Sequence, residues 1–450
     1  MQKPDKSTVN RVVASSLIGA TIEWYDFFLY GVMASVVLNK LYFPSHDALT
    51  SLMLAYATFA VGFLTRPIGG IIFGHFGDRI GRKSMLVTTL MIMGISTFVI
   101  GLVPTYEQIG FWAPTLLLLM RVLQGIGLGG EWGGAVLMAY EYAPEGKRGF
   151  YTSIPQLGLS FGILLSAATV AILSNVLTDA QFFAWGWRIG FLASCVLVVV
   201  GLWIRLRIFE TPDFMNVKEQ QIEAKVPLAD LFQRFSGNVF LGLGARHIDG
   251  VFFNIFSVFS ISYLTQTVHI SRNDALMALM AGAVVLSICI PIAGTLSDKI
   301  SRAGLYGIAS LVSAVSAFPA FWTMSHSGGN QMLIWMAIII PYGVFYSAVY
   351  GNVAGFLCDL FDARVRYTGI SFVYQVTSAI AGMTALIATF LVKLNDGEPW
   401  LVCTYVLISG ILSTICALVI ARRQASQKVV NAGSQWRAGN APKALAKEML

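Results

Sequence analysis

Charged residues are scarce in this chain. Lys, Arg, Asp and Glu make up 12% of its 450 residues, whereas 56% are apolar and the mean hydropathy is +0.70. A soluble globular domain usually carries about 25% charged residues. This composition excludes an ordinary soluble protein and predicts an all-α polytopic membrane protein.

Cysteine pairs and metal-binding patterns are also absent from the sequence. The five cysteines, Cys195, Cys289, Cys358, Cys403 and Cys416, lie in or at the end of apolar runs, and none forms a CxxC pair. No HExxH or comparable spacing occurs. We interpret the cysteines as small core residues and expect no disulfide, no metal site and no cofactor.

Two motifs of soluble enzymes match by spacing alone. Residues 125–130 fit G-x-G-x-x-G, and residues 158–162 fit the G-x-S-x-G nucleophile motif. Each motif needs a strand before it and a helix after it, but both lie inside long apolar runs. Small residues at four-residue spacing let neighbouring helices approach closely. We therefore assign Ser160 no catalytic role, identify no catalytic residues, and expect the protein not to be an enzyme.

Apolar runs of the length that crosses a bilayer recur along the chain. A helix needs about 20 residues to cross roughly 30 Å of hydrocarbon, and lipid offers the backbone no hydrogen-bond partner outside a helix or closed barrel. Twelve such runs are predicted near 12–38, 51–75, 84–103, 113–140, 151–174, 187–207, 239–265, 275–297, 305–325, 332–357, 367–393 and 401–421.

The 30 Lys and Arg residues are distributed unevenly between the two sides of these runs. Most lie in the N-terminal segment, the even-numbered loops and the tail. The exceptions are Lys40, Arg188, Arg272 and Lys393 at odd-numbered loops, and Arg66, Arg121 and Arg246 inside runs. Since cytoplasmic loops carry the excess of basic residues, we expect both termini in the cytoplasm. The net charge of +7 belongs to these loops and implies no nucleic-acid partner.

Two pairs of loop segments indicate an internal duplication. GHFGDRIGRK (74–83) is similar to GTLSDKISRAG (294–304), and KRGFYTS (147–153) is similar to VRYTGIS (365–371). Asp78 aligns with Asp298 at an offset of 220, and Arg148 aligns with Arg366 at an offset of 218. The repeat predicts two six-helix halves. The expected segments are a cytoplasmic N-terminus (1–11), a first half (12–207), a linker (208–238), a second half (239–421) and a cytoplasmic tail (422–450).

These features resemble the major facilitator superfamily. G-x-x-x-D-R-x-G-R-K follows the second run, with a weaker copy after the eighth. Further segments are similar to the bacterial metabolite:proton symporters, which carry shikimate, 2-oxoglutarate, citrate, and proline or betaine: IEWYDF (22–27), RPIGGIIFGHFGDRIGRK (66–83), GLGGEWGGA (127–135), WGWRIGF (185–191) and ETPDF (210–214). The resemblance implies the major facilitator fold, alternating access and a bacterial cytoplasmic (inner) membrane.

One departure separates the two loop copies. The second copy has Ser301 and Ala303 where the first has Gly81 and Lys83. The strength of the gate can therefore differ between the halves.

Two carboxylates lie about halfway through the first run. Glu23 and Asp26 share one helix face with Gly19 and Tyr30. Ionisable groups at this depth are costly and mark functional sites, and two close carboxylates in a low dielectric should not both stay ionised. We predict that Asp26, assisted by Glu23, carries the coupling proton. The alternative is a salt bridge that only holds helices together.

Buried arginines are the candidates for binding a substrate carboxylate, because the guanidinium fork donates two parallel hydrogen bonds. Arg121 and Arg246 are the best placed in the sequence. Arg121 can instead pair with Asp26 or Glu131, and Arg246 shares a face with Asp249, so that the two can neutralise each other.

An apolar lining with a few hydroxyl and amide groups suits a small acid, although such stripes more often serve packing. The further lining candidates are Tyr30, Gln124, Glu131, Trp132, Gln156, Tyr346, Tyr374 and Gln375. Arg66, beside Pro67, is expected to brace helices or the cytoplasmic vestibule.

Charged residues at the cytoplasmic ends of the runs predict a gate. Opposite charges there can hold the halves together while the site faces outward, and separate when it faces inward. The predicted gate residues are Asp78, Arg82, Glu141, Arg148, Asp298, Arg302 and Arg366.

The sequence thus predicts a proton-coupled symporter that imports a small organic acid by alternating access, from a site near the midplane between the halves. The acid is a mono- or dicarboxylate or a shikimate-like cyclic acid. Its expected partners are protons and the lipid bilayer, and the expected state is a monomer. A zwitterionic osmolyte such as proline or betaine is the alternative substrate. A membrane-bound sensor or enzyme is the alternative from another class.

Overall fold

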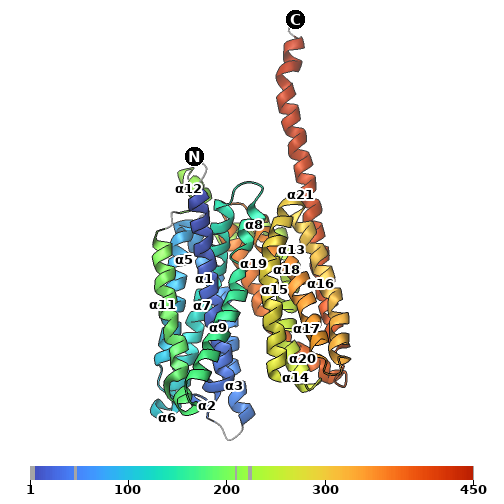
Figure 1. The fold of residues 1–450 in the computed structure, drawn as a ribbon. Helices are drawn as coiled ribbons and strands as arrows, with labels where there is room; N and C mark the ends of the chain where they lie inside the picture. The colour runs from blue at the N-terminus through green and yellow to red at the C-terminus, as the bar shows by residue number, and fades with distance from the viewer. Residues whose placement is uncertain (1–5, 45–47, 208–209, 221–225, 449–450) are drawn as a thin grey trace.

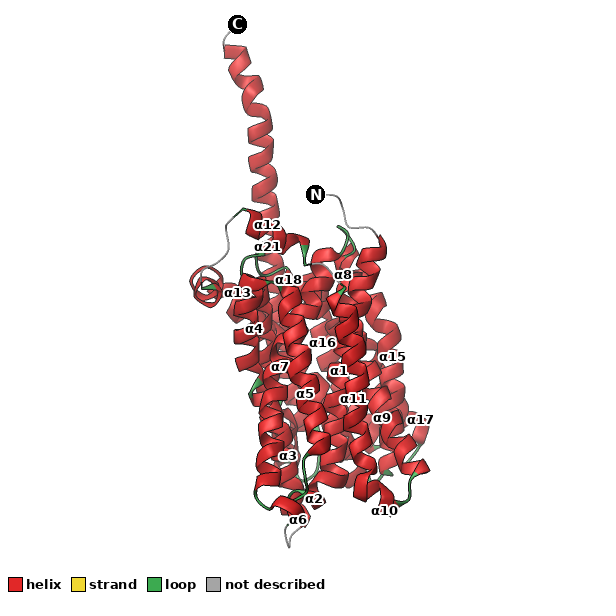
Figure 2. Ribbon diagram, turned by 90° about the vertical axis from the view of Figure 1, so that its left-hand side faces the viewer, coloured by secondary structure: helices red, strands yellow, loops and turns green. Residues whose placement is uncertain are grey.

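The computed structural model describes residues 6–44, 48–207, 210–220 and 226–448, and within these ranges the secondary structure is entirely helical (Figure 2). Twelve helical segments are long and apolar enough to cross a membrane. They stand roughly parallel, and both chain ends lie at the same end of the bundle (Figure 1). We call this end the terminal face. The all-α polytopic fold predicted from the sequence is confirmed.

Each predicted apolar run corresponds to one helical segment. The segments are Ser7–Leu41, Met53–Ile80, Arg82–Leu102, Trp112–Tyr142, Arg148–Val176, Asp179–Leu206, Pro227–Gln266, Asp274–Lys299, Arg302–Ser325, Gln331–Cys358, Arg366–Leu394 and Trp400–Ser426.

The part of the chain before residue 220 forms one bundle, which we call the first bundle. Its elements are α1 (Lys6–Met33), η1 (Ala34–Leu38), α2 (Asn39–Leu41), α3 (Ala48–Leu64), α4 (Arg66–Ile80), α5 (Arg82–Leu102), α6 (Tyr106–Ile109), α7 (Trp112–Tyr142), α8 (Arg148–Ser153), α9 (Leu157–Val176), α10 (Asp179–Gln181), η2 (Phe182–Gly186), α11 (Trp187–Leu206) and α12 (Pro212–Glu219). The segments labelled η are π-helical.

The rest of the chain forms the second bundle. Its elements are α13 (Pro227–Asn254), η3 (Ile255–Phe259), α14 (Ser260–Gln266), α15 (Arg272–Lys299), α16 (Arg302–Ser325), α17 (Gln331–Ile338), η4 (Ile339–Phe345), α18 (Tyr346–Cys358), α19 (Arg366–Ala381), α20 (Thr384–Leu394) and α21 (Trp400–Glu448). Helix α13 begins inside the segment 208–238 and has a non-helical residue at Phe235. Helix α21 continues past its apolar part and projects from the terminal face (Figure 1).

The two bundles stand side by side (Figure 1). Helices α4 and α7 of the first bundle contact α19 of the second, and α8 and α9 contact α15. Functional side chains between the bundles must therefore come from these helices and from those beside them.

Glycine-rich segments lie where helices of the first bundle approach most closely. A Cβ atom on Gly129 of α7 would lie 2.2 Å from the carbonyl oxygen of Arg66, and one on Gly162 of α9 would lie 2.4 Å from Cβ of Trp24. Both glycines belong to motifs that resemble enzyme signatures, and both lie inside helices. The packing interpretation of these motifs is confirmed.

The five cysteines are free, as predicted, but they are not all core residues. Cys358 and Cys403 are buried, Cys289 and Cys416 are half-buried, and Cys195 is exposed on α11. The prediction of a core position is wrong for Cys195, because the outer surface of a membrane helix accepts apolar side chains as readily as the core does.

Candidate functional site

A small cavity lies between the two bundles. Helices α1, α3, α4 and α9 contribute to it from one side, and α13, α18 and α19 from the other. Its polar and aromatic lining includes Trp24, Arg66, Arg246, Asp249, Tyr350 and Tyr374. The cavity therefore combines two buried arginines, one carboxylate and several aromatic rings.

Arg246 in this cavity is paired through both of its terminal nitrogen atoms, and its Nε has no hydrogen-bond partner among the described residues. Its Nη2 lies 3.0 Å from Oδ2 of Asp249, so the two charges compensate each other as their shared helix face predicted. Its Nη1 donates to the carbonyl oxygen of Tyr374 at 2.9 Å and to Oγ1 of Thr377 at 2.6 Å. Tyr346 donates its hydroxyl to Oδ1 of Asp249 at 2.7 Å. This set of residues has no net charge.

Arg66 is the contrasting case. Its side chain lines the cavity and is only 3% exposed, yet its Nε and Nη2 atoms have no hydrogen-bond partner among the described residues. The guanidinium carbon lies 4.7 Å from the ring centre of Phe63 and 5.1 Å from that of Phe27. Its strongest charged neighbour is Glu23. The sequence assigned Arg66 a bracing role and missed its place in the cavity; the RPIGG segment was the available signal.

Asp26 and Arg121 belong to a separate network inside the first bundle. Thr97 donates its hydroxyl to Oδ2 of Asp26 at 2.7 Å, and Nε2 of Gln124 donates to the Thr97 hydroxyl at 2.6 Å. Nη1 of Arg121 donates to Oε1 of Gln124 at 2.8 Å, and its guanidinium lies 4.0 Å from the ring centre of Tyr30. Arg121 is thus linked to Asp26 through two bridging side chains, and none of these residues lines the cavity.

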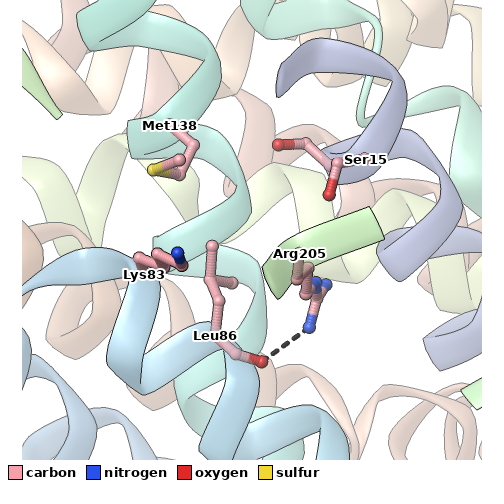
Figure 3. A pocket seen from close by; sticks show the side chains of 6 residues that line it. Ser15, Lys83, Leu86, Met138 and Arg205 are labelled. Carbon is pink, nitrogen blue, oxygen red and sulfur yellow. Dashed lines mark hydrogen bonds between the residues drawn. The ribbon is translucent and has the colours of Figure 1, made fainter. Parts of the chain in front are cut away.

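Glu131 lies in another buried cluster, away from the cavity. It forms a short salt bridge with Arg205 and accepts a hydrogen bond from the hydroxyl of Thr89 at 2.9 Å. Nη1 of Arg205 also donates to the carbonyl oxygen of Leu86 at 2.6 Å, beside a small pocket (Figure 3). In this structure Glu131 joins α7 to α11 and α5.

Trp132, Gln156 and Gln375 connect the two bundles beside the cavity. The ring of Trp132 stacks on that of Tyr374 with 3.5 Å between centroids, and its Nε1 donates to Oε1 of Gln156 at 3.0 Å. Nε2 of Gln156 donates to the carbonyl oxygen of Tyr350 at 3.1 Å, and Nε2 of Gln375 donates to that of Gly129 at 3.0 Å. In this conformation these side chains hold the cavity wall together.

At the terminal face, Asp78 at the end of α4 accepts hydrogen bonds from the start of α19. The donors are the backbone N–H of Tyr367 at 3.3 Å, and the backbone N–H and hydroxyl of Thr368 at 2.9 Å each. The first N–H groups of a helix lack intrahelical acceptors and favour a negative charge. Asp78 thereby fastens the first bundle to the second.

Asp298, the counterpart of Asp78 in the internal repeat, makes the equivalent contact from the second bundle to the first. Asp298 at the end of α15 accepts from the backbone N–H groups of Gly149 at 2.7 Å and Phe150 at 2.9 Å, in the first turn of α8. Arg302 lies 2.9 Å from Asp298 and 2.8 Å from Asp359. The internal repeat thus appears as two crossed contacts between the bundles.

A chain of ion pairs joins these contacts. Arg82 lies 3.4 Å from Asp78 and 3.6 Å from Glu141, and Arg366 lies 3.0 Å from Glu141. Nη2 of Arg82 also donates to the carbonyl oxygen of Ala363 at 2.8 Å. Glu141 is therefore shared by one arginine from each bundle.

Arg148 takes part through an aromatic ring. Its guanidinium lies 4.6 Å from the ring centre of Tyr140, whose hydroxyl donates to Oδ1 of Asp359 at 2.6 Å. All seven predicted gate residues thus lie at the terminal face and take part in the contacts between the bundles or directly beside them. Their role in gating stays a prediction.

Glu210 was missed as a member of this group. One of its carboxylate oxygens accepts from the backbone N–H of Arg82 at 3.1 Å, and the other accepts from that of Lys83 at 3.2 Å. Glu210 lies in the ETPDF segment, which the sequence indicated only as a family motif. Within the ranges the structure describes, no group of three His, Cys, Asp or Glu residues is arranged to hold a metal ion.

Comparison with known proteins identifies the family to which this architecture belongs. Residues 12–237 match the family described as "Sugar (and other) transporter", and residues 243–448 match the "Major Facilitator Superfamily". The proton:xylose symporter XylE has the same fold, with a TM-score of 0.71 and 18% identity over 93% of this chain and 95% of its own.

Curated relatives are more similar in sequence. The shikimate transporter of Escherichia coli (strain K12) is 37% identical over 93% of this chain and 97% of its own length. The proline/betaine transporter of the same strain is 32% identical over 86% of this chain and 79% of its own. The chain belongs to the major facilitator superfamily, within its metabolite transporter family, and is a multi-pass membrane transporter of small metabolites rather than an enzyme.

Proposed function

We propose that the protein imports a small organic acid together with a proton, by alternating access around the cavity between the bundles. The observation that carries this proposal is Arg66, a buried cation with two unpaired nitrogen atoms at a cavity wall. A buried charge without partners is costly. A substrate carboxylate would supply two acceptors for the guanidinium.

The remaining lining supports a small, partly apolar acid. Trp24, Phe63, Phe253 and Tyr350 provide aromatic surface, and the Arg246–Asp249 pair contributes polar atoms without net charge. A ring or short chain that carries one or two carboxylates fits this chemistry. Of the residues predicted to bind substrate, we retain Arg246, Tyr346 and Tyr374. Arg121, Tyr30, Gln124 and Glu131 belong to networks inside the first bundle.

The two carboxylates of α1 are the candidates for the proposed proton carrier. Oδ1 of Asp26 and Oε2 of Glu23 are buried and have no hydrogen-bond partner among the described residues. Each carboxyl group therefore has an oxygen on which a proton can reside. The other oxygen of Asp26 accepts from Thr97, which still permits the protonated form.

The contacts at the terminal face support alternating access. Asp78, Asp298 and Glu141 connect the bundles in this conformation, and separating the bundles there would open the cavity to that side. We infer that the terminal face is cytoplasmic, because the loops at this end carry most of the Lys and Arg residues. The proposed location is the bacterial cytoplasmic membrane, and the proposed working unit is a monomer.

A zwitterionic osmolyte is the second candidate substrate. A quaternary ammonium group binds favourably over aromatic faces, and Trp24, Tyr350 and Tyr374 surround the cavity. Similarity to a proline/betaine transporter points the same way. Uptake stimulated by osmotic upshift would favour this candidate.

The test is uptake into liposomes that contain the purified full chain. Radiolabelled shikimate, 2-oxoglutarate, citrate, proline and glycine betaine are compared with and without an imposed pH gradient, acidic outside. We expect accumulation of at least one acid that a protonophore abolishes. Accumulation of a zwitterion alone, or of an acid regardless of the pH gradient, would contradict the proposal.

A further inference from the structure

We propose that Glu23 is the exchangeable counter-ion of Arg66, so that a proton on Glu23 releases Arg66 to bind one substrate carboxylate. This inference rests on the proposed organic-acid transport and assigns its coupling to one pair of residues. Each bound carboxylate is expected to enter with one proton. The cavity with bound substrate then has the same net charge as the empty cavity.

Glu23 and Arg66 are both buried and incompletely hydrogen-bonded. Glu23 and Arg66 are each 3% exposed, and each has buried side-chain atoms without a hydrogen-bond partner among the described residues. The guanidinium carbon of Arg66 lies 5.1 Å from the ring centre of Phe27, one turn after Glu23 on α1. The two charged groups interact through space without forming a salt bridge within 4.0 Å. Because no salt bridge closes the pair, the unpartnered nitrogen atoms of Arg66 can donate to another carboxylate at the cavity wall.

The other charged groups around this pair are compensated by partners of their own. Arg246 is compensated by Asp249 at 3.0 Å, and Arg205, the more distant cation near Glu23, is compensated by Glu131. Tyr350 and Tyr374 face Glu23 from the second bundle and carry no charge in their ordinary state. Glu23 is therefore the group whose ionisation decides whether Arg66 is neutralised.

Asp26 is the other acid on α1, but it is tied elsewhere. Its Oδ2 accepts from Thr97, which continues through Gln124 to Arg121. Arg121 and Arg66 thus have different acids as their nearest partners. The two carboxylates of α1 serve separate arginines, only one of which lines the cavity.

The exchange is balanced in atoms and charge. In the empty site the Glu23 carboxylate compensates the Arg66 guanidinium. A proton from outside converts Glu23 to the neutral carboxylic acid, and the substrate carboxylate then accepts hydrogen bonds from Arg66. On the other side the carboxylate leaves, Glu23 releases its proton to water, and the Glu23–Arg66 pair is restored. One anion and one proton have crossed, with no net charge.

The experiment compares the wild type with Glu23→Gln in liposomes, with radiolabelled shikimate as the probe and a trapped pH-sensitive dye to record proton entry. We expect the variant to lose proton entry while shikimate counterflow stays measurable. Its uptake should instead respond to a membrane potential, positive inside, because the anion then crosses alone. The wild type should be insensitive to that potential.

Glu107→Gln is the matched control, since it makes the same chemical change at an exposed residue of α6. We expect it to behave as the wild type does. Continued entry of one proton with each shikimate in Glu23→Gln would overturn the inference, as would loss of proton entry in the control.

A second pair of variants keeps the test decisive if Glu23→Gln does not fold. Glu23→Asp keeps the carboxyl group and should retain proton entry. Arg66→Lys keeps the charge but loses the guanidinium fork, so the apparent affinity for shikimate should fall roughly 10- to 100-fold while proton entry is retained. Arg234→Lys, the same change at an exposed arginine of α13, is its control. Unchanged shikimate affinity in Arg66→Lys would overturn the inference.

Failure of the proposed function gives a different result. If the wild type transports none of the organic acids, the organic-acid proposal itself fails. If the wild type couples shikimate to protons and Glu23→Gln does so too, only the assignment to Glu23 and Arg66 fails. Glycine betaine uptake is measured in the same set of variants. If glycine betaine gives the results expected for shikimate and shikimate does not, the zwitterionic osmolyte is the favoured substrate class.

Discussion

The two copies of the loop motif make the same contact with different residues around it. Asp78 accepts from the first turn of α19 and Asp298 from the first turn of α8. In the first copy, the helix that follows is capped by the distant carboxylate of Glu210. In the second copy, the side chain of Ser301 caps the following helix itself, through the N–H of Gly304 at 3.2 Å.

The copies also differ in contact with water. The side chains of Asp78 and Arg82 are fully buried, whereas those of Arg302 and Asp359 are 16% and 24% exposed. When a charged side chain loses its ion-pair partner, water solvates the remaining charge if the side chain is partly exposed, so the loss costs less free energy. The two copies of a repeated motif can therefore contribute different amounts of free energy to the contacts between the bundles. We expect the first copy to dominate the stability of the closed terminal face.

The largest expected effect is that of Asp78→Asn. Removing one partner from a buried charged group costs about 3–5 kcal/mol, and here Arg82 keeps one carboxylate, Glu141 at 3.6 Å, and the uncharged carbonyl oxygen of Ala363 at 2.8 Å. The cost falls on the conformation closed at the terminal face, so the bundles should open there. Ser371 is buried on α19, and its Oγ would lie 2.2 Å from a Cβ atom on Gly133 of α7. The measurement is labelling of Ser371→Cys by an impermeant maleimide, in a background without the native cysteines. Unchanged labelling from the terminal face would remove Asp78 from the gate.

Gly81→Ala is expected to have the next largest effect. Gly81 has φ 130° and ψ 150°, a region that is essentially confined to glycine and costs other residues about 1–3 kcal/mol. A Cβ atom there would also lie 2.2 Å from an oxygen of Glu210. Thermal unfolding in detergent should show a clear loss of stability. Gly110→Ala, at φ 59° with open space around the added Cβ, is the control for backbone strain alone.

Asp298→Asn should affect the gate less than Asp78→Asn does. Its partner Arg302 keeps Asp359 at 2.8 Å and is partly hydrated, so we expect a cost of about 1–2 kcal/mol from the weakened hydrogen bonds to α8. The same labelling assay should give an intermediate result. An effect as large as that of Asp78→Asn would mean that burial does not distinguish the two copies.

Ser301→Ala should produce the smallest change. Loss of a serine helix cap costs about 1 kcal/mol, whereas glycine at the same position costs only a few tenths. Thermal unfolding should therefore rank the wild type and Ser301→Gly close together, with Ser301→Ala below them. Equal stability of the alanine and wild-type proteins would show that Ser301 does not stabilise the start of α16 in the way that Glu210 is expected to stabilise the start of α5.

The contacts at the terminal face were easier to predict than the cavity. The predicted gate residues lie at the ends of helices, at equivalent places in two sequence repeats, and opposite charges there are visible without knowledge of the fold. Asp249 was also predictable as the partner of Arg246, because residues three apart share a helix face. Such local spacing could not decide between Arg66 and Arg121, since both are buried arginines inside apolar runs.

The sequence by itself determined the twelve helices and the internal repeat, because hydrocarbon imposes helix length and apolar composition on every span. Only the tertiary structure decided which buried charges meet. Glu23 and Asp26 lie one turn apart on α1, but their electrostatic partners, Arg66 on α4 and Arg121 on α7, differ. The physical reason is that one face of α1 contacts several neighbouring helices. The positions at which those helices cross α1, rather than the residue spacing along α1, determine which charge each carboxylate faces.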